Sequence, residues 1–454
     1  MIWLAASEGV VVIEKKLSLA EVTAIGIGGM IGGGIFAVLG LAIAVAGHSV
    51  ALTLAAGGVI ALLTGISYAH LGLAFRGDGG SFTYIERAFN APTIAGLSGW
   101  LLIVGYIGTL ALYASAFGDY GAAFVKSAGF ISLPSGLLAT FALGLFLLVN
   151  LVGVKVAGGV ELGVVAIKLA ILMLFAVVGA FGVHMSHFSP VFNHGVLTPL
   201  AAIALIFVAY EGFELIPNAI DEMDAPERNL KRAILIAIVV TSVIYVTVAI
   251  VALGNLTTAQ IHRDQEYVLA VAAEPRLGQA GFVLISIAAL LSTASAINAT
   301  LFGAARLAMV MAREHALPRI FSMRERNRPV PYVALWGLTA ASLAFTLTAN
   351  LEVISTLASA TFLLIFAIVN LAALKLAGRI GLRPLAPFAG CLLSAASFAV
   401  LIWHAWVTDL TSIEWLAGFY GIAILVEATL VWRRGVRKVL PERADNASGR
   451  VLSS

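Results

Sequence analysis

The sequence predicts an all-α polytopic membrane protein, because of its composition and its repeated apolar segments. Of the 454 residues, 61% are hydrophobic and 11% are charged, whereas soluble proteins average about a quarter charged residues. Apolar segments of about 20 residues, the length that crosses a bilayer as a helix, recur along nearly the whole chain. The single cysteine, Cys391, excludes a disulfide framework within one chain. No basic residue precedes the mildly apolar first thirteen residues, so no cleavable signal peptide is expected.

Twelve membrane-spanning helices are expected, separated by polar, turn-rich stretches such as R-G-D-G-G-S at 76–81. Their ranges are about 18–46, 50–75, 92–124, 133–153, 160–182, 198–221, 230–254, 279–312, 331–348, 352–374, 385–407 and 414–433. The eighth is long enough to extend beyond the bilayer. The amphipathic stretch before it, which includes L-T-T-A-Q-I-H-R at 256–263, is expected to form short surface helices or an unstructured loop. The polar residues from Pro441 onward are expected to be disordered.

The lysine and arginine residues predict the orientation, because short cytoplasmic loops are enriched in both. With the N-terminus inside, 22 of the 27 fall in inner segments. Three fall in outer segments, namely Lys126, Arg263 and Arg276. Both termini are therefore expected in the cytoplasm, in a multi-pass protein of the cytoplasmic membrane, and an even number of spans agrees with this.

The first span contains an unusual number of glycines. Residues 25–36 read I-G-I-G-G-M-I-G-G-G-I-F, in which six of twelve residues are glycine. A glycine in a helix interior costs roughly 0.5–1 kcal/mol relative to alanine, so this helix is expected to break. The alternative is that the glycines serve close packing between unbroken helices.

The sixth span is expected to break as well. Residues 209–219 read A-Y-E-G-F-E-L-I-P-N-A, which places two carboxylates, a glycine and a proline inside an apolar segment. An acid at bilayer depth costs roughly 2.5–3.5 kcal/mol on insertion scales. Proline cannot donate a backbone hydrogen bond and clashes with the preceding turn.

The spacing of the two weak points predicts an inverted repeat. Gly32 and Gly212 are 180 residues apart, and so are the starts of the first and sixth spans. The sixth span comes five spans after the first, so the two repeat units that begin with these spans insert into the membrane with opposite orientation. Paired broken helices at the membrane midplane are typical of a transporter's binding site. The expected organisation is a tail, two repeats, two further helices and a second tail, at 1–17, 18–182, 198–374, 385–433 and 434–454.

Five motifs, in order and on the expected spans, resemble one family of transporters. They are G-I-G-G-M-I-G-G-G-I-F in the first span, G-G-S-F-T-Y-I-E-R-A-F at 79–89, F-V-A-Y-E-G-F-E at 207–214, A-P-E-R-N-L-K-R-A-I at 225–234, and L-L-S-T-A-S-A-I-N-A-T-L-F-G-A-A-R at 290–306, followed by M-A-R-E-H-A-L-P. Over about residues 15–435, the chain resembles the amino acid–polyamine–organocation (APC) superfamily, and most closely its archaeal and bacterial proton-coupled amino acid transporters. The resemblance implies a LeuT-type fold, with five-plus-five inverted repeats, broken helices 1 and 6, and two extra C-terminal helices.

The resemblance also implies a secondary transporter that imports amino acids with protons by alternating access. The amides of Gly32, Gly33 and Gly34 would bind the substrate carboxylate, as helix N-termini favour anions. Many relatives carry serine or alanine in the middle of this triplet, so Gly33 removes any help from a side chain. Carbonyls at the end of the first half-helix, at Met30 and Ile31, would bind the substrate ammonium.

Carbonyls near Val208 and Glu211 in the sixth span would share the ammonium, by the same resemblance. The aromatic residues Phe207, Tyr210 and Phe213 are candidates for closing the pocket, although each could serve simple packing. 

Lys168 lies near the middle of the fifth span, and an ionisable residue at this depth is a functional hypothesis by default. In proton-coupled relatives a lysine at this place replaces a sodium ion between the first and eighth spans. The resemblance therefore implies that the Lys168 ammonium meets the Gly28 carbonyl and the Ser292 hydroxyl. The alternative is a snorkelling or structural lysine. Glu161 is two helical turns away, too far for a direct ion pair.

The two acids of the sixth span, Glu211 and Glu214, differ in how common they are among the relatives that the sequence resembles. Glu214 matches an acid of several relatives, where it is linked to gating or proton handling. Glu211 is less usual in the family, and two interpretations remain open. It could favour a basic or amine substrate, or it could join the unwound segment to another helix.

Other charged groups suggest weaker hypotheses. The loop acids around Glu227 could form an inner gate with Arg76, Lys15 or Lys16. Three outer histidines raise the possibility of a metal site, but zinc needs a fourth ligand and tighter spacing, so no metal and no cofactor are expected. These histidines are His184, His187 and His194.

Alternatives to a proton-coupled importer are a sodium-coupled symporter and an amino acid or amine exchanger that prefers cationic substrates. Lys168 argues against sodium, because an ammonium would displace the ion. An enzyme is not expected, since no Ser/His/Asp grouping, zinc-protease motif or Walker A sequence is found. The broken helices also permit a channel, but the inverted repeat favours alternating access. The expected partners are an amino acid, a proton and membrane lipids, without nucleic acid, for a monomer or weak homodimer.

Overall fold

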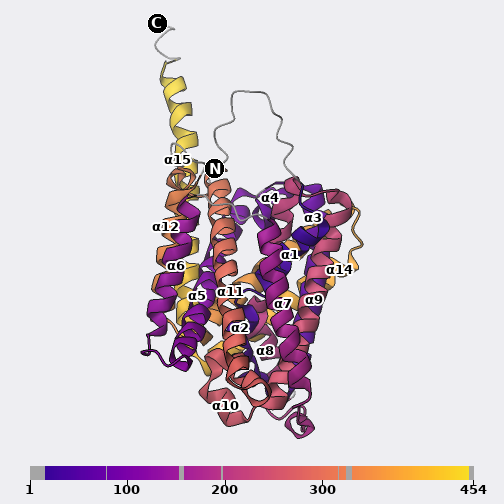
Figure 1. Cartoon of the computed structure of the whole chain (residues 1–454). Helices are drawn as coiled ribbons and strands as arrows, with labels where there is room; N and C mark the ends of the chain where they lie inside the picture. The colour runs from indigo at the N-terminus through magenta and orange to yellow at the C-terminus, as the bar shows by residue number, and fades with distance from the viewer. Residues whose placement is uncertain are drawn as a thin grey trace, which may run out of the picture.

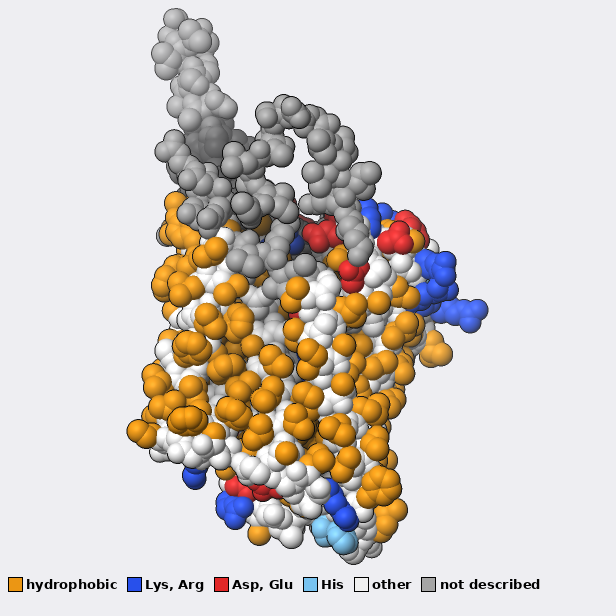
Figure 2. Space-filling view, in the orientation of Figure 1, with side chains coloured by type: hydrophobic (Ala, Val, Ile, Leu, Met, Phe, Trp, Pro, Cys, Tyr) orange, Lys and Arg blue, Asp and Glu red, His pale blue; other side chains and the backbone are white. Residues whose placement is uncertain are grey.

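The computed structural model describes residues 16–77, 79–152, 158–195, 198–314, 316–323 and 330–448, and these residues are helical throughout apart from turns and connections. Among them, ten helices are long and apolar enough to cross a membrane, and two shorter apolar helices, Leu19–Met30 and Tyr332–Thr348, accompany them. Hydrophobic side chains cover the lateral face seen in Figure 2, and charged side chains gather toward its two ends. The chain is therefore a multi-pass membrane protein, as predicted, while the count of twelve spans stays a prediction.

The first half of the chain forms seven α-helices and two short 3₁₀ helices. These are α1 (Leu19–Met30), α2 (Gly34–Ala46), η1 (Gly47–Ser49), α3 (Val50–Ala74), α4 (Gly80–Phe89), α5 (Pro92–Ser127), α6 (Ser135–Val152), α7 (Gly158–Ala180) and η2 (Met185–Phe188). A capping box begins α1, since the Ser18 hydroxyl accepts the Glu21 amide and the Glu21 carboxylate accepts the Ser18 amide. Pro92 begins α5, where a missing N–H costs nothing.

The second half follows the same pattern of long apolar helices joined by short segments. Its elements are α8 (Thr198–Ile206), η3 (Phe207–Tyr210), η4 (Phe213–Glu222), α9 (Pro226–Asn255), α10 (Thr258–Arg263), η5 (Gln265–Tyr267), α11 (Val268–Arg313), η6 (Arg319–Ser322), α12 (Tyr332–Thr348), α13 (Leu351–Leu376), α14 (Leu385–Thr408) and α15 (Leu410–Ser448). A kink at Gly278, with φ 60° and ψ −157°, separates the start of α11 from the long helix predicted at 279–312.

One expectation about the C-terminus is wrong. The apolar stretch of α15 ends at Trp432, close to the predicted end of the span, but the helix itself continues to Ser448, so the segment from Pro441 to Ser448 is helical rather than disordered. Extending an existing helix requires no new nucleus, and the glutamate, the arginine and the two alanines of this segment are good helix formers.

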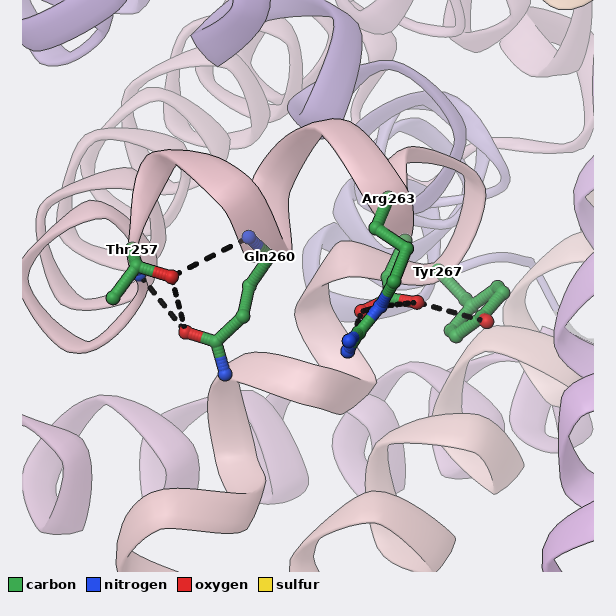
Figure 3. Close-up of polar contacts among 5 residues, drawn as sticks. Thr257, Gln260, Arg263 and Tyr267 are labelled. Carbon is green, nitrogen blue, oxygen red and sulfur yellow. Dashed lines mark hydrogen bonds and ion pairs between the residues drawn. The ribbon is translucent and has the colours of Figure 1, made fainter.

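The stretch between α9 and α11 forms short helices, which decides between the two predictions made for it. Helix α10 begins with a capping box in which Thr257 and Gln260 bond each other's backbone and side chain (Figure 3). At the other end of α10, Arg263 Nη2 lies 2.7 Å from Asp264 Oδ2, and Tyr267 donates to the same carboxylate.

The helices form one bundle, with α4 at one end and α10 at the other (Figure 1). Helix α5 lies along α11 and α13, while α1 lies beside α7 and α9. The apolar stretches of α5 and of residues 198–222 are almost wholly enclosed, whereas α14 and α15 are mostly exposed. The enclosed position of the sixth span gives its polar residues protein partners instead of lipid.

Candidate functional site at the two helix breaks

Both predicted weak points are interrupted in the structure. Helix α1 ends at Met30 and α2 begins at Gly34, with a turn between them. Helix α8 ends at Ile206, and after η3 the chain is extended at Glu211 (φ −66°, ψ 145°) and has a positive φ of 125° at Gly212. Such a φ is unfavourable for residues with a Cβ, which explains the glycine.

The two breaks touch each other through their backbones. A Cβ atom at Gly212 would lie 2.5 Å from the Met30 nitrogen, and one at Gly29 would lie 2.9 Å from Gly212 Cα. A Cβ atom at Gly34 would lie 2.7 Å from Ala209 Cα. The glycines therefore allow close packing as well as the break, but the helices that pack here are interrupted, unlike the unbroken helices of the alternative.

The start of α2 presents free backbone donors. The Ile31 amide donates to Ile27 O and the Gly32 amide to Gly29 O, at 2.8 and 3.1 Å. Among the described residues, the amides of Gly33 and Gly34 have no acceptor. Unpaired amides at a helix N-terminus attract an anion, so this end of α2 is chemically suited to a carboxylate.

Glycine at position 33 allows an aromatic ring to approach the backbone of the first break. A Cβ atom at Gly33 would lie 2.2 Å from Tyr113 Cδ1, so the ring of Tyr113 on α5 rests directly on this backbone. The Tyr113 hydroxyl also donates to Gly29 O at 3.4 Å. Any larger residue at position 33 would displace this ring.

Two carbonyls, one from each break, meet the same side chain. Tyr245 on α9 is fully buried, and its hydroxyl oxygen lies 2.5 Å from Met30 O and 2.8 Å from Ala209 O. Helix-end carbonyls favour cations. Tyr245 therefore joins Met30 to the sixth span, and the carbonyl of the sixth span in this contact is that of Ala209 rather than that of Val208 or Glu211.

Hydroxyls on α13 bind the backbone of the first half of the sixth span. Ser359 accepts the Val208 amide at 3.0 Å, and both Ser355 and Ser359 donate to Leu205 O at 2.7 Å. The Val208 carbonyl accepts the Glu211 amide at 3.1 Å. Both backbone groups of Val208 thus have protein partners.

The two acids are buried and point to different partners. Glu211 and Glu214 are 2% and 3% exposed. The Glu211 carboxylate accepts a hydrogen bond from Thr109 on α5, and Glu214 Oε2 accepts the Gly212 amide at 2.7 Å. The other oxygen of Glu214 has no partner among the described residues. The bond to Thr109 is the arrangement expected if Glu211 joins the unwound segment to another helix.

The three aromatic residues of the sixth span pack into a larger cluster. Phe207 and Phe213 both contact Phe366 on α13, with ring centroids 5.8 and 5.3 Å away. Tyr210 packs against Tyr245 and donates to Leu54 O at 2.5 Å. The packing interpretation of these residues thus has support, and a part in closing a pocket stays a prediction.

Lys168 contacts one of its two expected partners. It is fully buried, and its Nζ donates to Gly28 O at 3.2 Å. Ser292 is also buried, but its hydroxyl has no hydrogen-bond partner among the described residues. Glu161 accepts instead from Ser295 on α11, at 2.9 and 3.2 Å, and its carboxylate lies against Gly28.

The end of the bundle predicted to face the cytoplasm is held by backbone bonds. The Leu17 amide donates to Glu222 O at 2.7 Å, and the Asp224 amide donates to Leu17 O at 2.9 Å. Arg76 pairs with Glu227 at 2.5 Å on the surface. Lys16 donates to the Asp221 carbonyl of η4, and Lys15 lies outside the described residues.

The outer histidines bond mainly to backbone. His187 contacts Leu253 O and His194 contacts Val45 O, each through Nδ1 at 3.2 Å, while His184 stacks near His187. Within the described part of the chain, no group of three metal-binding side chains is found.

Sequence reasoning missed Thr109, Tyr113 and Tyr245, which touch the breaks from α5 and α9. Thr109 and Tyr113 are four residues apart, so they lie on one face of a helix. Polar side chains at that spacing in an apolar span were a usable signal. Tyr245 offered none beyond being a polar residue in an apolar span.

Comparison with known proteins places the chain among relatives that are similar over most of its length. A family model described as amino acid permease matches residues 17–426. An uncharacterized protein of Methanocaldococcus jannaschii is 32% identical over 95% of this chain and 98% of its own length. The inner membrane transport protein YbaT of Escherichia coli is 30% identical over 91% and 96%. The branched-chain amino acid permease BcaP of Bacillus subtilis is 27% identical over 73% and 74%.

Proposed function

Because the chain belongs to the amino acid permease family, we propose that it imports amino acids across the plasma membrane, coupled to protons, by alternating access. Its family members are transporters rather than enzymes. The names of two relatives, a transport protein and a branched-chain amino acid permease, support an amino acid as the substrate.

The two breaks support binding of a zwitterion. The free amides of Gly33 and Gly34 would hold the α-carboxylate, and the carbonyls of Met30 and Ala209 would hold the α-ammonium. These groups belong to breaks that touch at Gly29 and Gly212, so one small molecule could reach both kinds of group.

The observation that carries proton coupling is the bond from Lys168 to Gly28. It places a buried ammonium on the last turns of α1, close to the break. Taking an ammonium out of water is costly, so a change in its surroundings shifts its protonation. Loss of the proton weakens the bond to Gly28 and loosens α7 from α1.

The proposed cycle follows from these contacts. Substrate enters from outside, its carboxylate binds at α2 and its ammonium binds between the breaks. The bundle then moves around this site, and the inner contacts between Leu17 and residues 222–224 separate. Deprotonation of Lys168 toward the cytoplasm accompanies release of the substrate.

The test is uptake into liposomes that contain the purified protein, with separate proton and sodium gradients. Labelled alanine, leucine and lysine serve as probes. A proton gradient should accelerate uptake by the wild type, and Lys168→Met should reduce this acceleration by roughly tenfold or more, as expected for loss of a hydrogen bond to a charged group.

The matched control is Lys126→Met, because Lys126 is exposed at the end of α5. It should behave as the wild type. Proton-driven uptake that survives in Lys168→Met would rule out the role of Lys168. Uptake driven by sodium alone would favour the sodium-coupled alternative.

A preference for cationic substrates is the second candidate, and it depends on Glu211. The bond from Thr109 to Glu211 favours a structural role for the carboxylate. Lysine and arginine should therefore compete no better than alanine for uptake. Stronger competition by these two would assign Glu211 to the substrate side chain.

A further inference from the structure

Tyr245 contacts both interrupted helices with a single oxygen atom. Its hydroxyl is 2.5 Å from Met30 O and 2.8 Å from Ala209 O, which are both hydrogen-bond distances. A phenol has one proton, so it donates to one of these carbonyls at a time. Among the described residues, neither carbonyl has another donor.

At any one time, one carbonyl of the pair therefore has no donor from the described part of the chain. An unpaired carbonyl buried in a protein inside a membrane is costly. The Tyr245 oxygen also keeps lone pairs that can accept a hydrogen bond. The three oxygens together form a cluster that is rich in acceptors and short of donors.

We propose that Tyr245 is the third acceptor of a site for a primary ammonium group, and that it makes the transporter select primary amines over N-alkylated ones. The inference rests on the proposed function. A primary ammonium brings three N–H donors, one each for Met30 O, Ala209 O and the Tyr245 oxygen. On binding, the hydroxyl keeps its bond to one carbonyl, which can accept a second donor because its oxygen has two lone pairs, and the ammonium donates to both carbonyls and to the Tyr245 oxygen.

An N-methyl group removes one of these donors and adds a carbon next to an oxygen. A site built for hydrogen bonds rejects an analogue that lacks one, because a buried polar atom is then left unpaired. The position of the Tyr245 oxygen is well defined, since its ring is fully buried and packs edge-on against Tyr210 at 5.4 Å. The oxygen can therefore discriminate between the two kinds of amine.

The experiment measures binding by thermal shift of the purified full chain. The probes are L-alanine, L-leucine and L-lysine, each compared with its α-N-methyl counterpart. For any probe that binds, the wild type should prefer the primary amine by roughly tenfold or more, the scale of one hydrogen bond to a charged group. Tyr245→Phe should bind the primary amine more weakly and reduce the preference to about threefold or less.

Tyr120→Phe is the matched control, because Tyr120 is buried and donates to Phe36 O on α2, whereas its hydroxyl bonds neither Met30 O nor Ala209 O. It should keep the preference of the wild type. If Tyr245→Phe does not fold, Tyr245→Met is the second variant, since methionine fills irregular space well.

Equal binding of primary and N-methyl forms by the wild type would overturn the inference, and so would an unchanged preference in the Tyr245 variants. These results would leave the proposed function intact. If none of the amino acids shifts the wild type, the proposed function fails and the inference fails with it.

Discussion

At the scale of single residues, the buried polar side chains near the breaks mostly bond groups that the breaks leave free. Lys168 donates to Gly28 O, Glu214 accepts the Gly212 amide, and Ser359 accepts the Val208 amide. A backbone group inside a membrane must find a partner within the protein. The polar residues of these apolar spans are thus explained by the backbone beside them.

Thr109 provides a prediction at this scale. Replacing it with valine removes the only donor to the Glu211 carboxylate among the described residues, while keeping the shape of the side chain. A buried acceptor left unpaired costs about 1–3 kcal/mol. Thr109→Val should therefore lower the melting temperature in detergent by several degrees.

Thr339→Val is the control for this variant. Thr339 is buried, and its hydroxyl has no partner among the described residues. The same substitution at position 339 should leave the melting temperature unchanged or raise it slightly, because it removes a buried hydroxyl that has no partner among the described residues. Equal destabilisation by the two variants would contradict the importance of the contact between Thr109 and Glu211.

At the scale of elements, the broken helices depend on glycines that have no room for a side chain. Gly212 has a φ of 125°, and a Cβ there would lie 2.5 Å from the Met30 nitrogen. The obstacle is backbone, which cannot move aside as a side chain can.

Gly212→Ala should therefore separate the two breaks and abolish binding of amino acids. The strained φ alone costs about 1–3 kcal/mol, and the clash adds to it. The checks are the melting temperature and the thermal shift with L-alanine and L-leucine. Binding at the level of the wild type would show that the breaks need not touch.

Gly144→Ala is the matched control on α6. A Cβ atom at Gly144 has no described atom within 4 Å, and the residue lies inside a regular helix. Alanine should stabilise that helix by roughly 0.5–1 kcal/mol. Loss of binding in this variant would point to a general intolerance of alanine for glycine.

At the scale of the whole molecule, one end of the bundle is held by a contact between segments about 200 residues apart. Leu17 and Met223 form a parallel bridge, which joins the start of α1 to the end of η4. Alternating access requires that such an end open during each cycle.

A disulfide across this bridge should block transport. Residues paired in this way lie about 5 Å apart, within the range of a disulfide. Leu17→Cys combined with Met223→Cys should lose most uptake on oxidation, by roughly tenfold, and recover it with a reductant.

Each single cysteine variant should transport equally well before and after oxidation. These controls also test the native Cys391, which is partly buried. Uptake that persists in the oxidised double variant, with the disulfide verified by mass spectrometry, would show that this end does not open.

Several features of the fold could be predicted from the sequence because they depend on local composition. The apolar lengths predicted the long helices, and the glycines at 32–34 and 212 predicted the breaks. The extent of α15 could not be predicted, since a helix can continue through polar residues once it has formed. The family was also predicted, from motifs at the breaks and in the loops.

The sequence by itself determined that this is a multi-pass helical membrane protein of a transporter family, with two interrupted helices. The physical reason is that hydropathy, glycine and proline act within a few residues of chain. Only the tertiary structure decided that Tyr245 meets Met30 and Ala209, that Thr109 meets Glu211, and that Glu161 bonds Ser295. Those contacts join helices far apart in the chain, so they depend on how the helices pack, which no local pattern encodes.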